Sequence, residues 1–248
     1  MEYKTRPLMK NKPFGAFLLL MGIIGVAIII MRIVCYEFEY VEGYYEVDYG
    51  RFNFFSFFTV QSNIYVSFYL ICLALSVFGN ERAKRIAFSP MVRLTVTTYI
   101  LVTGAVYCGG IPIGMTPPLS WDNFQHAMLG TVQVFHHMIM PPLMLILFLI
   151  PPTDERIKKK KLWIVGIYPF VYSVFSIIRG AFSNPEFYPY PFYRPEFFWN
   201  IFLKGREINL ISAYLLILPI LLLGIGVFIL LALILAVIYN KICSKMSE

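Results

Sequence analysis

The chain has 248 residues, of which 58% are hydrophobic and only 14% are charged, and its mean hydropathy is +0.69. A soluble domain carries roughly a quarter charged residues, so this composition excludes an ordinary soluble protein and indicates an integral membrane protein. The net charge of +7 does not indicate a nucleic-acid partner, because the basic residues gather in short stretches between apolar runs, which is the pattern of membrane topology.

Six apolar runs divide the chain, and each is long enough for a helix that crosses a bilayer, which needs about 20 residues. The first run is too long for the core of a signal peptide and has no small-residue cleavage site after it, so we expect it to be retained. The sequence predicts one all-α domain, residues 1–248, that is a polytopic membrane bundle of six transmembrane helices. The predicted spans are about residues 14–34, 54–78, 91–111, 123–150, 162–182 and 210–239.

Charged residues alternate between the two sides of this predicted bundle. The N-terminus, the loops after the second and fourth spans and the C-terminus are basic, whereas the loop after the first span is acidic. Cytoplasmic segments carry the excess of lysine and arginine, so both termini are expected in the cytoplasm, and an even number of spans requires one side for both. We expect a multi-pass protein of the cell membrane that contacts membrane lipids, and a homo-oligomer stays open.

The second span opens with polar side chains. Thr59, Ser62 and Asn63 share one helix face by their spacing of three and four residues. The Asn63 amide needs a hydrogen-bond partner inside the protein, because lipid offers none. A membrane threonine can instead bond to a carbonyl of its own helix, and an asparagine can simply join two helices, so a structural role stays open for both.

The fourth span holds all three histidines of the chain. Spacings of three, four and seven residues place its polar side chains on one helix face, which is unsuited to lipid. His136 lies off this face, and Pro141 and Pro142 are expected to kink the helix and to free carbonyl groups. The polar face consists of Asn123, His126, Gly130, Gln133 and His137, with Met144 continuing it.

Two arginines and an aromatic segment lie at the expected outer ends of the spans. Arg32 ends the first span and Arg179 ends the fifth, and each can extend its charge to the headgroup region or bind the carboxylate or phosphate of a lipid. The segment Tyr188–Tyr193 alternates aromatic residues with proline and fits a rigid cap at the outer interface, where tyrosine is favoured.

The spacing of histidines and cysteines argues against a haem or a metal site, and we expect no cofactor. His126 and His137 lie roughly 16 Å apart along one helix, so they cannot ligate one iron from opposite faces. Asp122 is the one carboxylate near the histidines, which makes a weak metal site. The four cysteines lack metal-binding spacing, and a disulfide between Cys35 and Cys108 at the outer side stays open.

Three motifs in a fixed order resemble the androgen-induced and androgen-dependent family of membrane hydrolases, and more closely its bacterial six-span relatives, which have no assigned activity. The resemblance covers the second to the fifth span and the loop that follows. The motifs are Arg51–Asn63, which ends in Phe-Thr-Val-Gln-Ser-Asn, then His137–Pro142, and then Arg179–Gly180 followed by Tyr188–Phe192.

The resemblance implies a threonine nucleophile and a histidine base that cleave the ester bond in fatty acid esters of hydroxy fatty acids. Thr59 matches the nucleophile at the start of a span, and His137 matches the histidine a short interval before a proline. A neutral histidine can take the proton from a threonine hydroxyl and pass it to the leaving alcohol. Supporting roles in catalysis or substrate binding are expected for Asn63, Gln133, His126, His136, Arg179 and Arg32.

The leading hypothesis is therefore an integral membrane lipid ester hydrolase. A second hypothesis is a non-enzymatic transporter or receptor that binds a lipid or small molecule in the same polar chamber, although the missing internal repeats count against a transporter. A third is a structural membrane protein in which the polar side chains only lock helices together.

Overall fold

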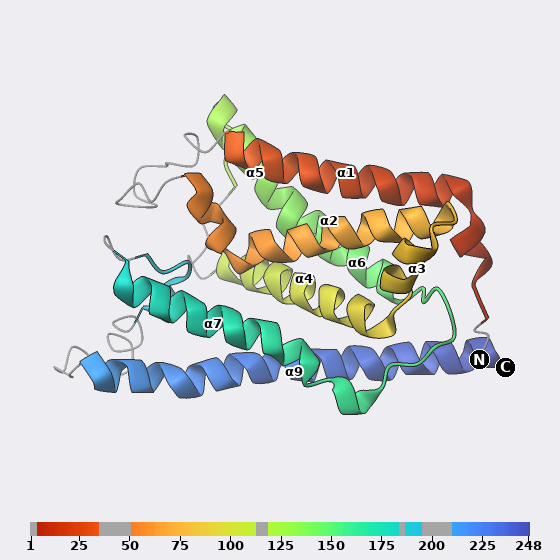
Figure 1. The fold of residues 1–248 in the computed structure, drawn as a ribbon. Coiled ribbons are helices and arrows are strands. Elements are labelled where there is room, and N and C mark those ends of the chain that lie inside the picture. Colours follow the sequence, from red (N-terminus) through yellow and green to blue (C-terminus); the bar gives the residue numbers. More distant parts are fainter. Residues whose placement is uncertain (1–3, 35–50, 113–118, 184–186, 195–209) are drawn as a thin grey trace.

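The computed structural model describes residues 4–34, 51–112, 119–183, 187–194 and 210–248, and these ranges are helical with no strand (Figure 1). Six helical segments are long and apolar enough to cross a membrane. The predicted fold class, an all-α membrane bundle with six transmembrane helices, is confirmed. The chain is a multi-pass membrane protein.

The helices begin and end close to the predicted bounds, with two differences. The second span starts at Phe58, because residues 51–56 form a separate 3₁₀ segment, and the last helix continues to Ser247 beyond the predicted end at residue 239. Short helix α3 fills the loop after the second span. The helices are α1 Lys12–Val34, α2 Phe58–Val77, α3 Glu81–Ala87, α4 Pro90–Gly110, α5 Phe124–Val134, α6 Met140–Phe148, α7 Ile164–Phe182 and α9 Leu210–Ser247. The 3₁₀ segments are η1 Pro7–Lys10, η3 Arg51–Ser56, η5 Lys159–Lys161 and η6 Pro191–Tyr193, and a π-helical turn, η4, covers Phe135–Ile139.

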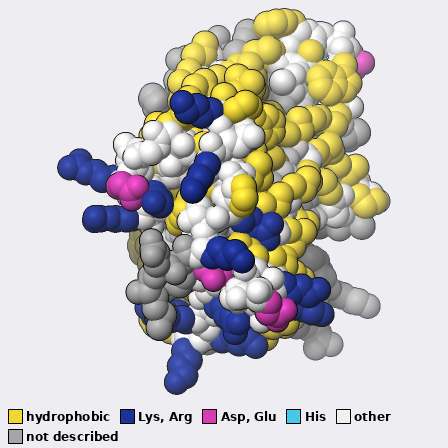
Figure 2. Space-filling view, turned by 90° about the vertical axis from the view of Figure 1, so that its right-hand side faces the viewer, with side chains coloured by type: hydrophobic (Ala, Val, Ile, Leu, Met, Phe, Trp, Pro, Cys, Tyr) yellow, Lys and Arg dark blue, Asp and Glu magenta, His cyan; other side chains and the backbone are white. Residues whose placement is uncertain are grey.

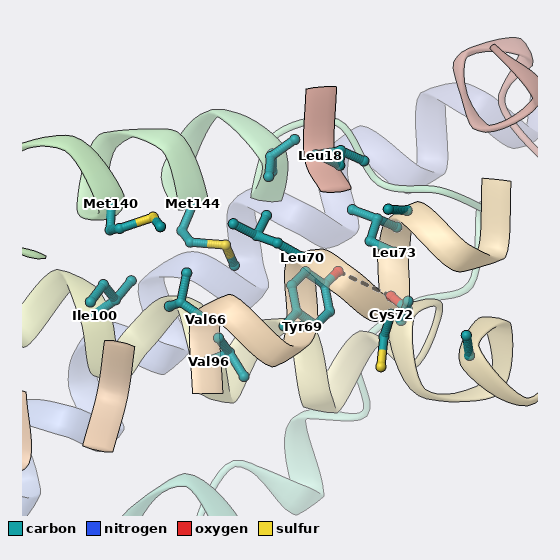
Figure 3. Packing of buried hydrophobic residues seen from close by; sticks show 14 of the residues in the cluster. Leu18, Val66, Tyr69, Leu70, Cys72, Leu73, Val96, Ile100, Met140 and Met144 are labelled. Carbon is teal, nitrogen blue, oxygen red and sulfur yellow. Dashed lines mark hydrogen bonds between the residues drawn. The ribbon is translucent and has the colours of Figure 1, made fainter. Parts of the chain in front are cut away.

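Helix α4 lies between two groups of packed helices (Figure 1). On one side α1, α2 and α6 pack around fully buried Leu70 and Met144, as Figure 3 shows. On the other side α7 and α9 pack around Val165 and Tyr239. Within their apolar windows, 61% of α2 is buried but only 22% of α9, so α2 is an inner helix and α9 presents most of its surface to lipid.

The two described ends of the chain lie side by side (Figure 1). Lys4 Nζ donates to the carbonyl oxygen of Met246 at 3.1 Å, and Arg6 N donates to the carbonyl oxygen of Pro152 at 3.0 Å. Figure 2 looks onto this end of the bundle, where lysine and arginine side chains outnumber acidic ones. An even number of spans requires both ends on the same side of the membrane, and the basic character of this end agrees with the charge pattern of the sequence.

Candidate functional site

The fourth span contains a π-helical turn at its two adjacent histidines. The N–H of Met140 donates to the carbonyl oxygen of Phe135, five residues back, and Pro141 and Pro142 have no N–H to donate. A π turn therefore lies just before the prolines, where the sequence predicted a kink. It also interrupts the single helix face that was predicted to run from His126 to His137. Such turns are frequent at functional sites.

The π turn makes backbone carbonyl groups available to neighbouring helices. Asn63 Nδ2 donates to the carbonyl oxygen of His136 at 3.4 Å and to that of Thr59 at 2.9 Å. The Cys108 thiol lies 4.0 Å from the carbonyl oxygen of His137. The Asn63 amide NH2 group therefore finds internal partners, and it ties the start of α2 to the π turn.

The His137 ring is held in one orientation. Its Nδ1 lies 3.0 Å from the carbonyl oxygen of Gln133, which can only accept, so Nδ1 carries the proton. The ring stacks on Tyr107 with 3.8 Å between ring centroids and an interplanar angle of 13°. In the neutral ring, Nε2 is consequently the atom with a free lone pair. Gln133 holds the histidine ring through its backbone carbonyl and not through its side chain.

His136 is fully buried and belongs to a group of polar atoms that lack partners in the described part of the chain. Its side chain is 0% exposed, and neither ring nitrogen has a hydrogen bond. Such buried atoms destabilise a protein unless a water or a ligand satisfies them. We name these atoms the inner polar group: both His136 ring nitrogens, Asn63 Oδ1, Ser67 Oγ and Gln133 Oε1.

Thr59 lies in the first turn of α2, where backbone N–H groups lack partners within the helix. Its N–H lies 3.2 Å from the Tyr190 hydroxyl, and its Oγ1 lies 3.2 Å from the same hydroxyl. Because the phenolic oxygen accepts the backbone N–H, the phenolic proton can point at Thr59 Oγ1. The threonine proton is then free for a base.

Helix α7 and the segment after it hold the start of α2. The Tyr172 hydroxyl accepts from Phe58 N at 3.1 Å and donates to the carbonyl oxygen of Ser56 at 2.7 Å. Tyr190 stacks on Phe192 with 5.1 Å between ring centroids and an interplanar angle of 4°. The aromatic cap predicted from the sequence thus reaches the threonine directly.

Burial raises the pKa of the Tyr190 phenol above its ordinary value, and its hydrogen bonds with Thr59 and the charge of Arg32 offset only part of this rise. Burial also raises the pKa of Tyr193 to about 12. Both phenols therefore keep their protons at neutral pH. Tyr190 can act as a hydrogen-bond donor to a negative oxygen.

The two predicted arginines have different surroundings. Arg179 donates to Ser56 Oγ and Asn53 Oδ1, and its guanidinium carbon lies 4.8 Å from the centroid of the Phe187 ring. Arg32 lies 5.7 Å from the centroid of the Phe54 ring, and its charge acts on Tyr190 and on both adjacent histidines. Arg179 thus holds η3 in place, whereas Arg32 lies over the ring of Phe54 in the same segment.

His126 lies apart from the other two histidines, at the first turn of α5. Its Nδ1 lies 3.0 Å from Ser120 Oγ and 3.8 Å from a carboxylate oxygen of Asp122. Asn123 accepts from the His126 N–H and caps the helix. The structure gives His126 no contact with Thr59 or His137 in the described ranges.

The proposed catalytic pair is close in the fold but not directly bonded. No hydrogen bond joins Thr59 to His136 or His137 among the described residues, and Asn63 connects the two elements through their backbones. The same residues contain no group of three or more histidine, cysteine or acidic side chains suited to a metal ion. Cys35 lies outside the described residues, so the predicted pairing with Cys108 stays a prediction.

Comparison with protein-family models, with curated proteins and with solved structures finds no match to this chain. Its function must be argued from its own residues. Sequence reasoning missed Tyr190 as the partner of Thr59 and Tyr107 as the stacking partner of His137. The alternating tyrosines and prolines after α7 were the signal for the first, and nothing local marked the second.

Replacing Gly104 with alanine is expected to lower the free energy of unfolding by about 1–3 kcal/mol, because overpacking forces neighbours apart. Helix α4 touches the π turn at this glycine, where an added Cβ would meet Pro141 Cγ at 2.7 Å and the His137 carbonyl oxygen at 3.0 Å. Thermal and denaturant unfolding in detergent micelles would measure the change. Gly226, whose added Cβ would meet no atom within 4 Å, provides the control, and equal losses in both alanine variants would contradict the close contact.

Proposed function

We propose that this protein is an integral membrane lipid ester hydrolase with Thr59 as nucleophile and His137 as base. The observation that carries the proposal is the position of the Thr59 hydroxyl, which lies 3.2 Å from the Tyr190 hydroxyl. Thr59 lies at the start of α2, and Asn63 ties this part of α2 to the π turn that contains the two histidines. The resemblance to the androgen-induced and androgen-dependent hydrolases adds the substrate class, fatty acid esters of hydroxy fatty acids.

The reaction would proceed in two steps. Thr59 Oγ1 attacks the ester carbonyl carbon while His137 Nε2 takes the hydroxyl proton, and the same proton then passes to the leaving alcohol. Water hydrolyses the acyl-threonine and releases the fatty acid. Catalytic hydrogen bonds are often long without substrate and shorten in the complex, so the missing Thr59–His137 bond is compatible with this role.

The surrounding groups fit the charges that develop. The hydrogen bond to Gln133 fixes the His137 ring so that Nε2 remains the acceptor. The Tyr190 hydroxyl can donate to the oxyanion, since it lies 3.2 Å from Thr59 Oγ1. The positive charge of Arg32 favours a substrate carboxylate beside the histidines. Asn63 and the His136 ring shape the buried wall of the site.

The proposed setting is the cell membrane, with both termini in the cytoplasm. The basic end that contains the two termini would face inward, and the end with Thr59 and Tyr190 would lie in the outer half of the membrane (Figures 1 and 2). A lipid ester would enter sideways from the bilayer with its acyl chains along the apolar helices. Self-association into a homo-oligomer stays a prediction.

Reaction with a fluorophosphonate tests the proposal. The purified full-length protein in detergent should form one covalent adduct, with loss of fluoride, and peptide mass spectrometry should map it to Thr59. Heat-unfolded protein should stay unmodified, because an unactivated threonine is a poor nucleophile. An adduct on another residue, or equal reaction of the unfolded protein, would refute the mechanism.

Tyr190→Phe is expected to slow the reaction with the fluorophosphonate by about 10- to 100-fold, since one donor to the developing oxyanion is lost. The ring remains, so its stacking with Phe192 is retained. The effect is measured as the rate of adduct formation, under conditions in which the variant and the wild type are both folded. Phe192→Leu is the control for the packing of the cap, and an equal loss in both variants would assign Tyr190 a packing role only.

A second candidate function is a receptor or transporter for a lipid or small polar molecule. The inner polar group favours it, because its buried atoms are free to bind a ligand's polar head. Under this function the protein would bind fluorescent lipid analogues without forming an adduct. Thr59 substitutions would then leave binding or flux intact.

A further inference from the structure

Arg93 is a buried cation at the opposite end of the bundle from Thr59, within the span that sequence reasoning treated as apolar. It lies in the first turn of α4 and is 1% exposed. Its Nη2 donates to the carbonyl oxygen of Leu147 on α6 at 2.7 Å. Its Nε and Nη1 have no hydrogen-bond acceptor among the described residues. No carboxylate of the described ranges pairs with it.

Other hydrogen-bond donors surround this guanidinium. Its central carbon lies 6.0 Å from the centroid of the Tyr69 ring on α2. Tyr239 on α9 is 0% exposed and interacts electrostatically with Arg93 and with the Cys243 thiol, one turn further along its own helix. Thr97, one turn further along α4, is also 0% exposed with an unpartnered hydroxyl. Residues of α2, α4, α6 and α9 thus surround the guanidinium, and none of them in the described ranges accepts a hydrogen bond from Nε or Nη1.

A permanent positive charge in such surroundings needs a counter-charge. Arginine does not lose its proton in a protein, so it cannot become neutral to relieve the burial. An unpaired buried charge is strongly destabilising, and a polarised tyrosine ring compensates only a small part of it. The α4 N-terminus adds positive potential at the same place. All these groups favour an anion that accepts several hydrogen bonds at once.

We propose that Arg93, with the Tyr239 and Thr97 hydroxyls, binds a small inorganic anion of the halide class between α2, α4, α6 and α9. Near-complete burial of these side chains favours a monatomic ion over a lipid headgroup, which shares the same anionic chemistry but carries acyl chains. The basic surface at this end, which includes Lys84 and Arg85, raises the local anion concentration (Figure 2). The bound ion would link α9 to the inner helices.

Thermal unfolding of the full-length protein in detergent tests the site. At constant ionic strength, replacing gluconate by chloride or bromide should raise Tm in a saturable manner. Arg93→Met should abolish the halide response, and Tyr239→Phe should raise the half-saturating halide concentration at least 5-fold. Lys241→Gln, which changes an exposed cation on the same helix as Tyr239, should respond like the wild type.

Three outcomes would overturn the proposal. One is a Tm that does not depend on the identity of the anion. Another is a half-saturating halide concentration that is the same in Tyr239→Phe as in the wild type. This result would refute the site even where the Arg93→Met protein does not fold. The third is stabilisation by inorganic phosphate, or by phosphatidic acid in nanodiscs, without any halide response, which would assign the site to a phosphate group.

Discussion

Thr59→Val protein is expected to lose adduct formation with a fluorophosphonate, to below about one thousandth of the wild-type rate. Valine keeps the shape of the threonine side chain and removes only the hydroxyl. The wild-type hydroxyl bonds to Tyr190, so the substitution also leaves that phenol without one of its contacts. Gel fluorescence and intact-mass measurement over time give the rate. Thr59→Ser should retain measurable reaction, because serine restores the hydroxyl.

Thr131 offers a matched control for this loss. It is an exposed threonine whose hydroxyl donates to the Ala127 carbonyl oxygen of its own helix, which is the common structural use of threonine in a membrane helix. Thr131→Val should react like the wild type. Undiminished reaction of Thr59→Val would exclude Thr59 as the nucleophile.

His137→Gln is expected to lower the rate of adduct formation by about 10²- to 10⁴-fold, the usual contribution of a general base. Glutamine can still donate toward the Gln133 carbonyl oxygen but cannot take the threonine proton. The stacking on Tyr107 would weaken as well, so thermal unfolding must accompany the rate measurement. A variant that unfolds near the wild-type Tm and reacts slowly has lost chemistry and not structure.

The other two histidines make this prediction specific. His126→Gln should be neutral, since its ring contacts Ser120 just before the start of α5. His136→Gln should affect the reaction less than His137→Gln, because His136 belongs to the inner polar group. A larger loss in His136→Gln would transfer the role of base from one ring to its neighbour.

The sequence predicted the architecture because that architecture depends on local quantities. Apolar length sets the number of spans, and lysine and arginine between them indicate which ends lie together. The start of α2 and the end of α9 were missed because an apolar run does not show where a 3₁₀ segment or an interfacial helical end occurs. Phe54 lies before α2 and Tyr239 lies within α9, yet both are buried hydrophobic residues. Their hydrophobicity therefore does not show where a transmembrane helix begins or ends.

The candidate site was predictable only in part, because its contacts join residues far apart in the sequence. Thr59, Asn63, His136 and His137 could be selected since each is polar within an apolar run. The Thr59–Tyr190 contact depends on how the loop after α7 returns to α2, which no spacing rule encodes. Arg93 was overlooked because an arginine near a span end is usually assigned to the interface, whereas helix packing buries this one completely.

The π turn also bears on how the fourth span tolerates changes in length. A turn with i to i−5 bonding contains one residue more than the regular helix, and each residue adds about 100° of rotation. Deleting one residue between 135 and 139 would therefore shorten no loop and remove no span. It would rotate α5 by about 100° relative to Pro141 and α6. A homologue with one residue fewer here would share the fold and differ in the side chains that surround His137.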